Sequence, residues 1–80
     1  MNHPGVYLKQ FIDDREISCH ELSLSLKVPA NRITDIVRGK RNISAKTAIL
    51  LGDFFNVDPK VWMNYQVEYD LYVARKEMEN

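Results

Sequence analysis

Apolar residues recur at the spacing of α-helices along five stretches of this chain, and short polar turns separate the stretches. In the first stretch, Leu8, Phe11 and Ile12 share one face of a helix that we expect over residues 4–15. Pro4 suits the first position of this helix, because the N–H that proline lacks would have no helical partner there. No stretch alternates apolar and polar residues as a strand does, so the pattern predicts an all-α fold.

The second and third stretches predict two short helices that lie close together. Ser18 begins the second helix in a capping-box pattern with Glu21, and this helix ends near residue 26. We expect the third helix over about residues 30–38, after a turn of three residues that contains a proline. Two helices joined by so short a turn match the helix-turn-helix motif, here at about residues 18–38, whose second helix enters the major groove of DNA.

Two further helices complete the predicted bundle. Gly39 suits the end of the third helix because glycine readily takes a positive φ, and Ser44 is placed to cap the fourth helix. Asp58 is the N-cap of the fifth helix, which begins with a proline and runs over about residues 59–75. We therefore expect a single five-helix domain over residues 1–80.

The charge of the chain is balanced overall but unevenly distributed. The net charge is zero, yet residues 27–46 hold six basic residues and one acidic residue, a charge of +5, and the remainder carries −5. A basic block of this kind is typical of a phosphate-binding surface, although a solvated charged loop has the same composition. The acidic remainder would repel DNA, aid solubility or meet a basic partner.

Cysteine content and hydropathy point to the cytoplasm. The single cysteine excludes a disulfide within the chain and gives no sign of an oxidising compartment. No apolar run approaches the ~20 residues of a membrane span. The first ten residues lack the basic-then-apolar order of a secretory signal, so we expect a cytoplasmic protein without a membrane partner.

Two groups of candidate DNA contacts lie in the basic block or in the helix before it. Base edges are read from the outer face and N-terminal end of a recognition helix, where Arg32 suits guanine, Asn31 suits adenine and Asp35 suits the cytosine amine. The predicted base-contact residues are Ala30, Asn31, Arg32, Thr34 and Asp35. Contacts to phosphate position the protein without reading the sequence. The predicted phosphate-contact residues are Ser18, Lys27, Arg38, Lys40, Arg41, Ser44 and Lys46.

Aromatic residues recur along the fifth helix in greater number than one helix of so small a domain normally buries. Such residues are enriched in interface hot spots, and core packing is the alternative for each of them singly. We expect part of this aromatic stripe to be shared between two subunits. The predicted dimer-interface residues are Trp62, Tyr65, Tyr69 and Tyr72.

Catalytic and metal-binding constellations are not visible in the sequence. Cys19 and His20 are neighbours on a helix and so point in different directions, and His3 is far from both along the chain. These residues do not have the spacing of metal ligands, and no glycine-rich phosphate loop is present. The sequence predicts neither an enzyme nor a requirement for a cofactor.

Three segments together resemble the HigA-type antitoxins, a branch of the lambda-repressor-like (XRE) helix-turn-helix family. They are HPG at residues 3–5, the helix-turn-helix with RGKRNIS at residues 38–44, and the tail DPKVWMNYQVEYDL at residues 58–71. The tail is the most specific, because it carries the family pattern W-x-N-x-Q-x-x-Y-D-L. The residues that match this pattern are Trp62, Asn64, Gln66, Tyr69, Asp70 and Leu71.

The resemblance implies a five-helix lambda-repressor-like domain that acts as a homodimer on double-stranded DNA with a palindromic operator. It also implies a RelE-like toxin partner that cleaves mRNA and is neutralised by binding. The chain departs from the family in having Cys19 where a glutamine often contacts the DNA backbone, and Lys27 where the turn usually has glycine. Two alternatives stay open: a transcriptional regulator without a toxin, and an interaction module that has lost DNA binding.

Overall fold

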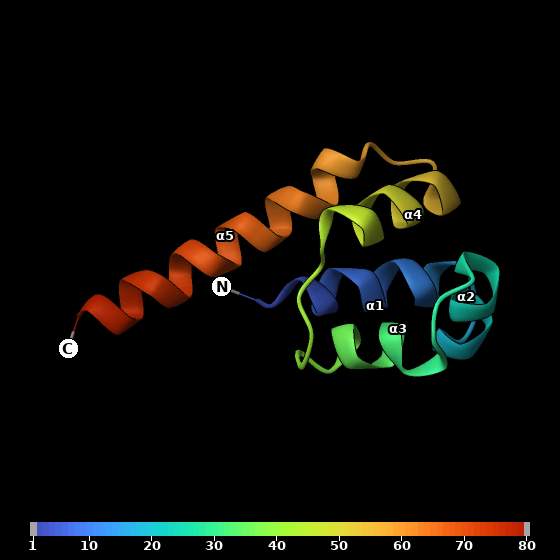
Figure 1. The fold of residues 1–80 in the computed structure, drawn as a ribbon, viewed down its shortest axis with the longest axis horizontal. Coiled ribbons are helices and arrows are strands. Elements are labelled where there is room, and N and C mark those ends of the chain that lie inside the picture. The colour runs from blue at the N-terminus through green and yellow to red at the C-terminus, as the bar shows by residue number, and fades with distance from the viewer. Residues whose placement is uncertain (1, 80) are drawn as a thin grey trace.

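The computed structural model describes residues 2–79 and consists there of five helices (Figure 1). Met1 and Asn80, which the prediction of a single domain included, lie outside the described residues. In chain order the helices are α1 (Pro4–Asp14), α2 (Cys19–Leu26), α3 (Ala30–Val37), α4 (Ala45–Phe55) and α5 (Pro59–Met78). The all-α prediction is confirmed. Helix α5 continues for three residues beyond its predicted end.

Side-chain caps fix where four of the helices begin. The Ser18 side chain accepts a hydrogen bond from Glu21 N, and the Glu21 carboxylate accepts one from Ser18 N, both at 3.0 Å, so the predicted capping box is present. Ser44 and Asp58 accept bonds from backbone N–H groups at the starts of α4 and α5, also as predicted. At α1 the acceptor is the Nδ1 atom of His3, which receives Gly5 N at 2.9 Å.

Left-handed residues end two of the helices and shape the turns that follow. Lys27 closes α2 with φ 59° and Asn56 closes α4 with φ 58°. Gly39 takes φ 78° just after α3, which agrees with its expected role there. Holding the backbone of a residue such as Lys27 in this left-handed region costs about 1 kcal/mol. The cost is smaller for asparagine than for most other residues.

The core lies between the helices and is built mainly from aliphatic side chains, with Phe55 and Trp62 as its buried aromatic residues. Leu8, Leu22, Ile33, Leu51 and Trp62 are all fully buried. One close approach depends on a missing side chain: a Cβ on residue 5 of α1 would lie 1.9 Å from the carbonyl oxygen of residue 36 in α3. The glycine at position 5 therefore lets α1 pack directly against the backbone of α3.

Helix α5 is much longer than the others and gives the molecule its elongated shape. The first part of α5 packs beside α4 and contacts α1, and its C-terminal part projects beyond the other helices (Figure 1). The extents of the fold are 42 × 22 × 21 Å. In residues 70–78 every side chain except Val73 is exposed, so this part of α5 has almost no packing within the chain.

Candidate nucleic-acid interface

Helices α2 and α3 are joined by a turn of three residues that fixes their relative orientation. The backbone N–H groups of Lys27 and Val28 donate to the carbonyl oxygens of Leu24 and Ser23 at 3.2 and 3.1 Å, which closes the end of α2. Buried side chains then hold α3 against the core on one face only. This is the geometry of a helix-turn-helix in which the other face of α3 is left to solvent.

The N-terminal turn of α3 is the most accessible part of that helix. Ala30 and Asn31 are exposed, while Arg32, Thr34 and Asp35 are partly buried. The N-cap position is a proline, so no side chain caps the first turn. Within residues 2–79 the side chain of Arg32 makes no hydrogen bond or ion pair with the rest of the chain, so it is available to a ligand.

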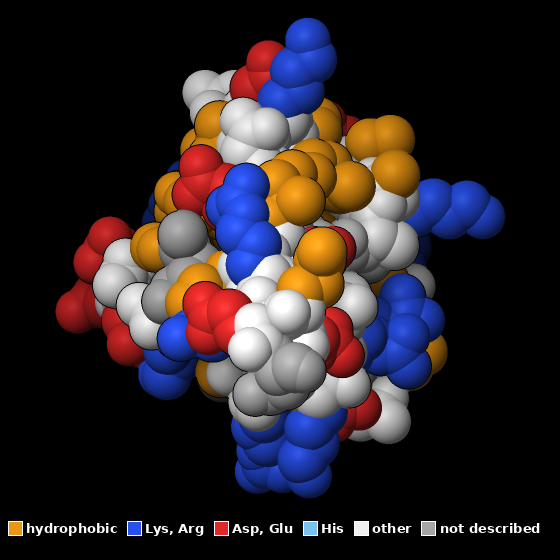
Figure 2. All heavy atoms as spheres, turned by 90° about the vertical axis from the view of Figure 1, so that its left-hand side faces the viewer, with side chains coloured by type: hydrophobic (Ala, Val, Ile, Leu, Met, Phe, Trp, Pro, Cys, Tyr) orange, Lys and Arg blue, Asp and Glu red, His pale blue; other side chains and the backbone are white. Residues whose placement is uncertain are grey.

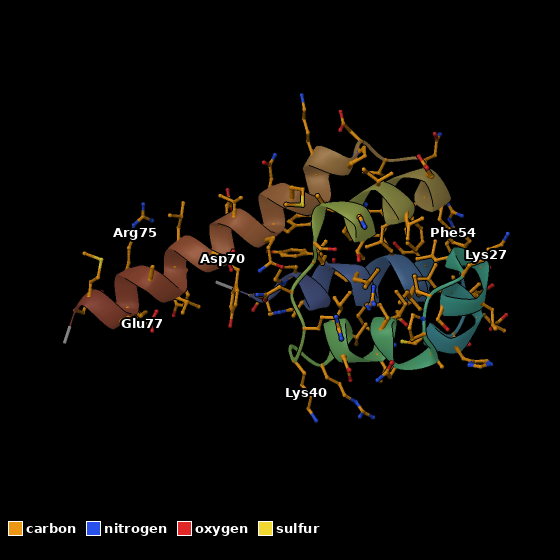
Figure 3. The ribbon with its side chains drawn as sticks, in the orientation of Figure 1. Lys27, Lys40, Phe54, Asp70, Arg75 and Glu77 are labelled. Carbon is orange, nitrogen blue, oxygen red and sulfur yellow. The ribbon has the colours of Figure 1, made fainter. Side chains whose placement is uncertain are left out.

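Residues 38–44, here called the basic linker, join α3 to α4. Arg38, Lys40 and Arg41 are all exposed, and none forms an ion pair within the part of the chain that the structure describes. Lys40 projects below the end of α3 in Figure 3. The linker turns back into the core at Ile43, which is only 2% exposed. Three of the predicted phosphate contacts are thus brought together beside α3.

The remaining predicted phosphate contacts are more scattered. Ser18 and Lys46 are exposed at the starts of α2 and α4. The Ser44 hydroxyl lies 3.3 Å from Thr47 N and 3.2 Å from Thr47 Oγ1, so its hydrogen-bonding capacity is largely used within the chain. Lys27 lies at one end of the molecule, beside Phe54, whereas Lys40 lies below the end of α3, away from it (Figure 3). The structure therefore separates Lys27 from the basic linker.

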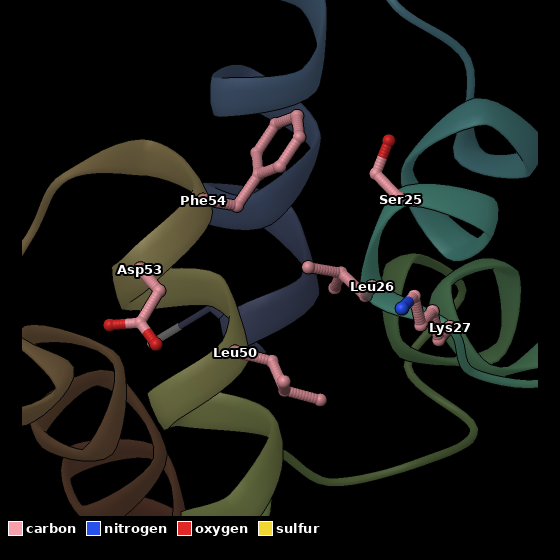
Figure 4. Close-up of a pocket in the computed structure, with 6 residues that line it drawn as sticks. All are labelled: Ser25, Leu26, Lys27, Leu50, Asp53 and Phe54. Carbon is pink, nitrogen blue, oxygen red and sulfur yellow. The ribbon is translucent and has the colours of Figure 1, made fainter.

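Lys27 borders a pocket of about 340 Å³ between α2 and α4 (Figure 4). Leu26 points across this pocket from the end of α2 towards Leu50 and Phe54 of α4. The polar residues that line this pocket are Ser25, Lys27 and Asp53. Among the described residues, no hydrogen bond joins Ser25 to Lys27 or Asp53, so this lining does not hold a serine nucleophile paired with a base.

The predicted aromatic interface on α5 needs one correction. Trp62 is 0% exposed and packs in the core against Phe11, at 4.7 Å between ring centroids, so it has no surface to offer a second chain. The prediction that Trp62 is an interface residue is wrong. It failed because a tryptophan can fill the core of so small a domain by itself, as the alternative of simple core packing supposed.

The other aromatic residues of α5 mostly face α1. Tyr65 stacks on Tyr7 at 4.1 Å and 10°, and Tyr69 meets the ring of His3 edge-on at 4.9 Å. Tyr72 lies further along α5 and is 37% exposed. Most of the aromatic stripe thus fastens α5 to its own chain.

A different stripe of α5 is left uncovered, and the sequence analysis missed it. Val67, Leu71, Ala74 and Met78 recur at helical spacing and are exposed; this set is called the outer stripe. The three large members are 49%, 47% and 84% exposed. In Figure 2 hydrophobic side chains gather over the upper part of the visible face, and basic side chains project at several of its edges, including the lower one. The same i, i+4, i+7 spacing was readable in the sequence.

Neither a metal site nor a membrane span appears among the described residues. No three histidine, cysteine, aspartate or glutamate side chains of residues 2–79 lie together in a way that would hold a metal ion. Over the same residues, no helix combines the length and the apolar character needed to cross a bilayer.

Comparison with known proteins agrees with this geometry. The Helix-turn-helix family model matches residues 8–62. Virulence-associated protein I of Dichelobacter nodosus is 37% identical over 79 residues, which cover 98% of this chain and 73% of that protein. The antitoxin HigA of Pseudomonas aeruginosa, solved with the higBA promoter, is 43% identical with a TM-score of 0.92, over 95% of this chain and 84% of that one.

A HigA-family addiction module antidote protein from Coxiella burnetii has the same fold. It is 38% identical with a TM-score of 0.89, over 95% of this chain and 84% of that one. These matches span the helix-turn-helix and α5 together, which a helix-turn-helix alone would not explain. The proteins of this group are DNA-binding regulators and not enzymes. The chain belongs to the HigA-type antitoxins of the lambda-repressor-like (XRE) helix-turn-helix family.

Proposed function

We propose that this protein binds DNA sequence-specifically as a dimer, represses its own operon and neutralises a toxin. The observation that carries the proposal is the exposed first turn of α3 beside the basic linker, in a chain similar to an antitoxin solved with promoter DNA. The first turn would enter the major groove while the linker binds phosphates of the same groove. DNA binding would then come from one continuous surface.

The residues of α3 suit the chemistry of base edges. Arg32 would donate two hydrogen bonds to guanine and Asn31 would pair with adenine, while Asp35 would accept from a cytosine amine. Ala30 and the Thr34 methyl group suit contact with a thymine methyl. Arg38, Lys40, Arg41 and Lys46 would neutralise phosphates and release counterions, which makes binding sensitive to salt.

The outer stripe of α5 supports the dimer. Apolar side chains that are about half exposed or more, in a row along a projecting helix, are most simply covered by the same stripe of a second copy related by a two-fold axis. Tyr72, which is exposed on the same helix, stays within the proposed interface. The two α3 helices would then read half-sites of a palindromic operator about one helical turn apart.

Gel-shift titration with DNA from upstream of the gene tests the DNA surface. Arg32→Ala and Arg41→Ala should each weaken binding about tenfold or more, because each removes a charged contact of roughly 1–3 kcal/mol. Lys60→Ala is the matched control, since it removes the same charge from an exposed position at the start of α5. Unchanged binding in both arginine variants would refute the assigned surface. Failure of the wild type to bind at low salt would favour the interaction-module alternative.

A RelE-like toxin that cleaves mRNA is the second partner we propose. The support is the similarity to proteins named antitoxin and addiction module antidote. Co-expression with the product of the neighbouring reading frame should rescue growth that the neighbouring product arrests alone, and the two chains should copurify. DNA binding without such a partner would leave a transcriptional regulator with no toxin.

A further inference from the structure

The basic linker has little structure of its own, although it carries most of the phosphate-binding side chains. Its first residues are tied to the end of α3, where Gly39 N and Lys40 N donate to backbone carbonyl oxygens at 3.0 and 2.8 Å. Beyond them only Ile43 is buried. The positions of Lys40 and Arg41 therefore depend on whatever holds the linker at its two ends.

One end of the linker is held by a buried side chain of α5. Gln66 is 4% exposed, and its Oε1 accepts a hydrogen bond from Ile43 N at 2.7 Å. Its Nε2 donates to Asp70 Oδ1 at 2.9 Å. This second bond selects the orientation of the amide, because the reversed amide would turn its Oε1 towards the Asp70 carboxylate, which cannot donate a hydrogen bond. Asp70 thus keeps the acceptor of Gln66 aimed at the linker.

The other end of the linker lies against a residue that α5 also contacts. A Cβ on Gly39 would be 3.8 Å from Cγ of His3, so the His3 ring packs beside this turn. The same ring meets Tyr69 edge-on at 4.9 Å, and its Nδ1 is occupied by Gly5 N. His3 therefore lies between the linker, α1 and α5. Its partner on α5, Tyr69, is one helical turn from Gln66.

We propose that one turn of α5 positions the basic linker for DNA, with Gln66 as the positioning residue for phosphate binding by Lys40 and Arg41. The proposal rests on the proposed DNA-binding function. It accounts for two sequence segments that make no predicted contact with DNA, at residues 3–5 and 66–70. Without the Gln66 acceptor, the N–H of Ile43 is left unpaired in the core. The linker can then move so that this N–H bonds to water instead.

The salt dependence of binding to upstream DNA tests this role. Gln66→Met keeps the size of the side chain and removes the acceptor. The slope of log affinity against log salt concentration should become shallower by the amount that corresponds to the loss of about one to two phosphate contacts. The affinity ratio between the operator and the same operator with single base changes should stay as in the wild type, because α3 is not altered. Loss of that ratio together with an unchanged slope would overturn the proposal.

A double-mutant cycle separates positioning from a general loss of stability. If Gln66 acts through the linker, Gln66→Met should add little to the loss already caused by Lys40→Ala with Arg41→Ala. Fully additive losses would overturn the proposal. Asp70→Ala is a second variant at an exposed position, and should make the slope shallower in the same direction even if Gln66→Met does not fold. An unchanged slope in Asp70→Ala would also count against the proposal.

Two controls keep the outcomes distinct. Glu68→Ala removes a negative charge from an exposed position of the same helix and should leave the slope of the wild type. A wild type that binds no upstream DNA overturns the proposed function and this inference together. A wild type that binds, with the same slope in Gln66→Met and Asp70→Ala, overturns the positioning role alone.

Discussion

The body of the molecule and the projecting part of α5 use apolar residues in opposite ways. In the body, which comprises α1 to α4 and the first part of α5, the apolar stripes face one another and close a core in which Leu8, Leu51 and Trp62 are fully buried. Along α5 a second stripe faces solvent, and Leu71 and Met78 are 47% and 84% exposed. The difference indicates that the body buries its own apolar side chains, whereas the end of α5 leaves its apolar side chains to solvent or to a partner surface.

The largest effect is expected from Gly5→Ala, which attacks the body. The added Cβ would lie 1.9 Å from the carbonyl oxygen of Ile36, so α1 and α3 must separate. We expect a loss of about 3 kcal/mol in the free energy of unfolding, at the upper end for an overpacked core. Urea denaturation measures this loss, and Val6→Ala at the next position is the control, expected within about 0.5 kcal/mol of the wild type. A wild-type midpoint in Gly5→Ala would contradict the close approach.

The next effect is expected from Leu71→Glu, which attacks the projecting region and spares the body. If the proposed dimer buries Leu71, a charge in its place, repeated by symmetry, should weaken that dimer by about 100-fold or more. Sedimentation equilibrium measures the change, and the unfolding midpoint of the body should shift little when compared at equal monomer concentration. Gln10→Glu places the same new carboxylate at an exposed position of α1 and should leave the proposed dimer intact. Equal dissociation in both variants would argue against the outer stripe.

The smallest effect is expected from Lys27→Gly, which relieves strain in the turn of the body. Because Lys27 holds φ 59°, glycine should stabilise the protein by about 1 kcal/mol. Thermal unfolding measures the gain. The same variant tests the predicted phosphate contact, because Lys27 lies away from the basic linker. A salt slope unchanged from the wild type would remove Lys27 from the DNA surface, and a shallower one would keep it there.

Helix boundaries could be predicted from sequence wherever a local hydrogen bond decides them. Ser18, Ser44 and Asp58 each accept a bond from a backbone N–H within three residues, and each was identified as a cap. The bond from Ile43 N to Gln66 Oε1 spans 23 residues, and no spacing rule reveals it. The contact that requires Gly5 is equally non-local.

The sequence allowed us to predict that the site binds DNA better than it allowed us to predict where each residue of the site lies. The charge block and the turn chemistry located α3 and the basic linker, because both are properties of neighbouring residues. The position of Lys27 at the far end of the molecule depends on how α2 packs on α4, which the block could not reveal. On α5 the aromatic residues drew attention away from Val67 and Leu71, since large rings suit both a core and an interface.

The helix content at the projecting end of α5 should depend on the concentration of the protein. A helical segment of about ten residues is not stable alone in water, and residues 70–78 have almost no intrachain packing to support them. In the proposed dimer, association would contribute part of the free energy that orders this segment, so that dimer should be weaker than its apolar contacts alone would make it. Helix content measured by circular dichroism should rise on concentration, and occupancy of a two-half-site operator should rise more steeply than it would for a dimer that is already formed.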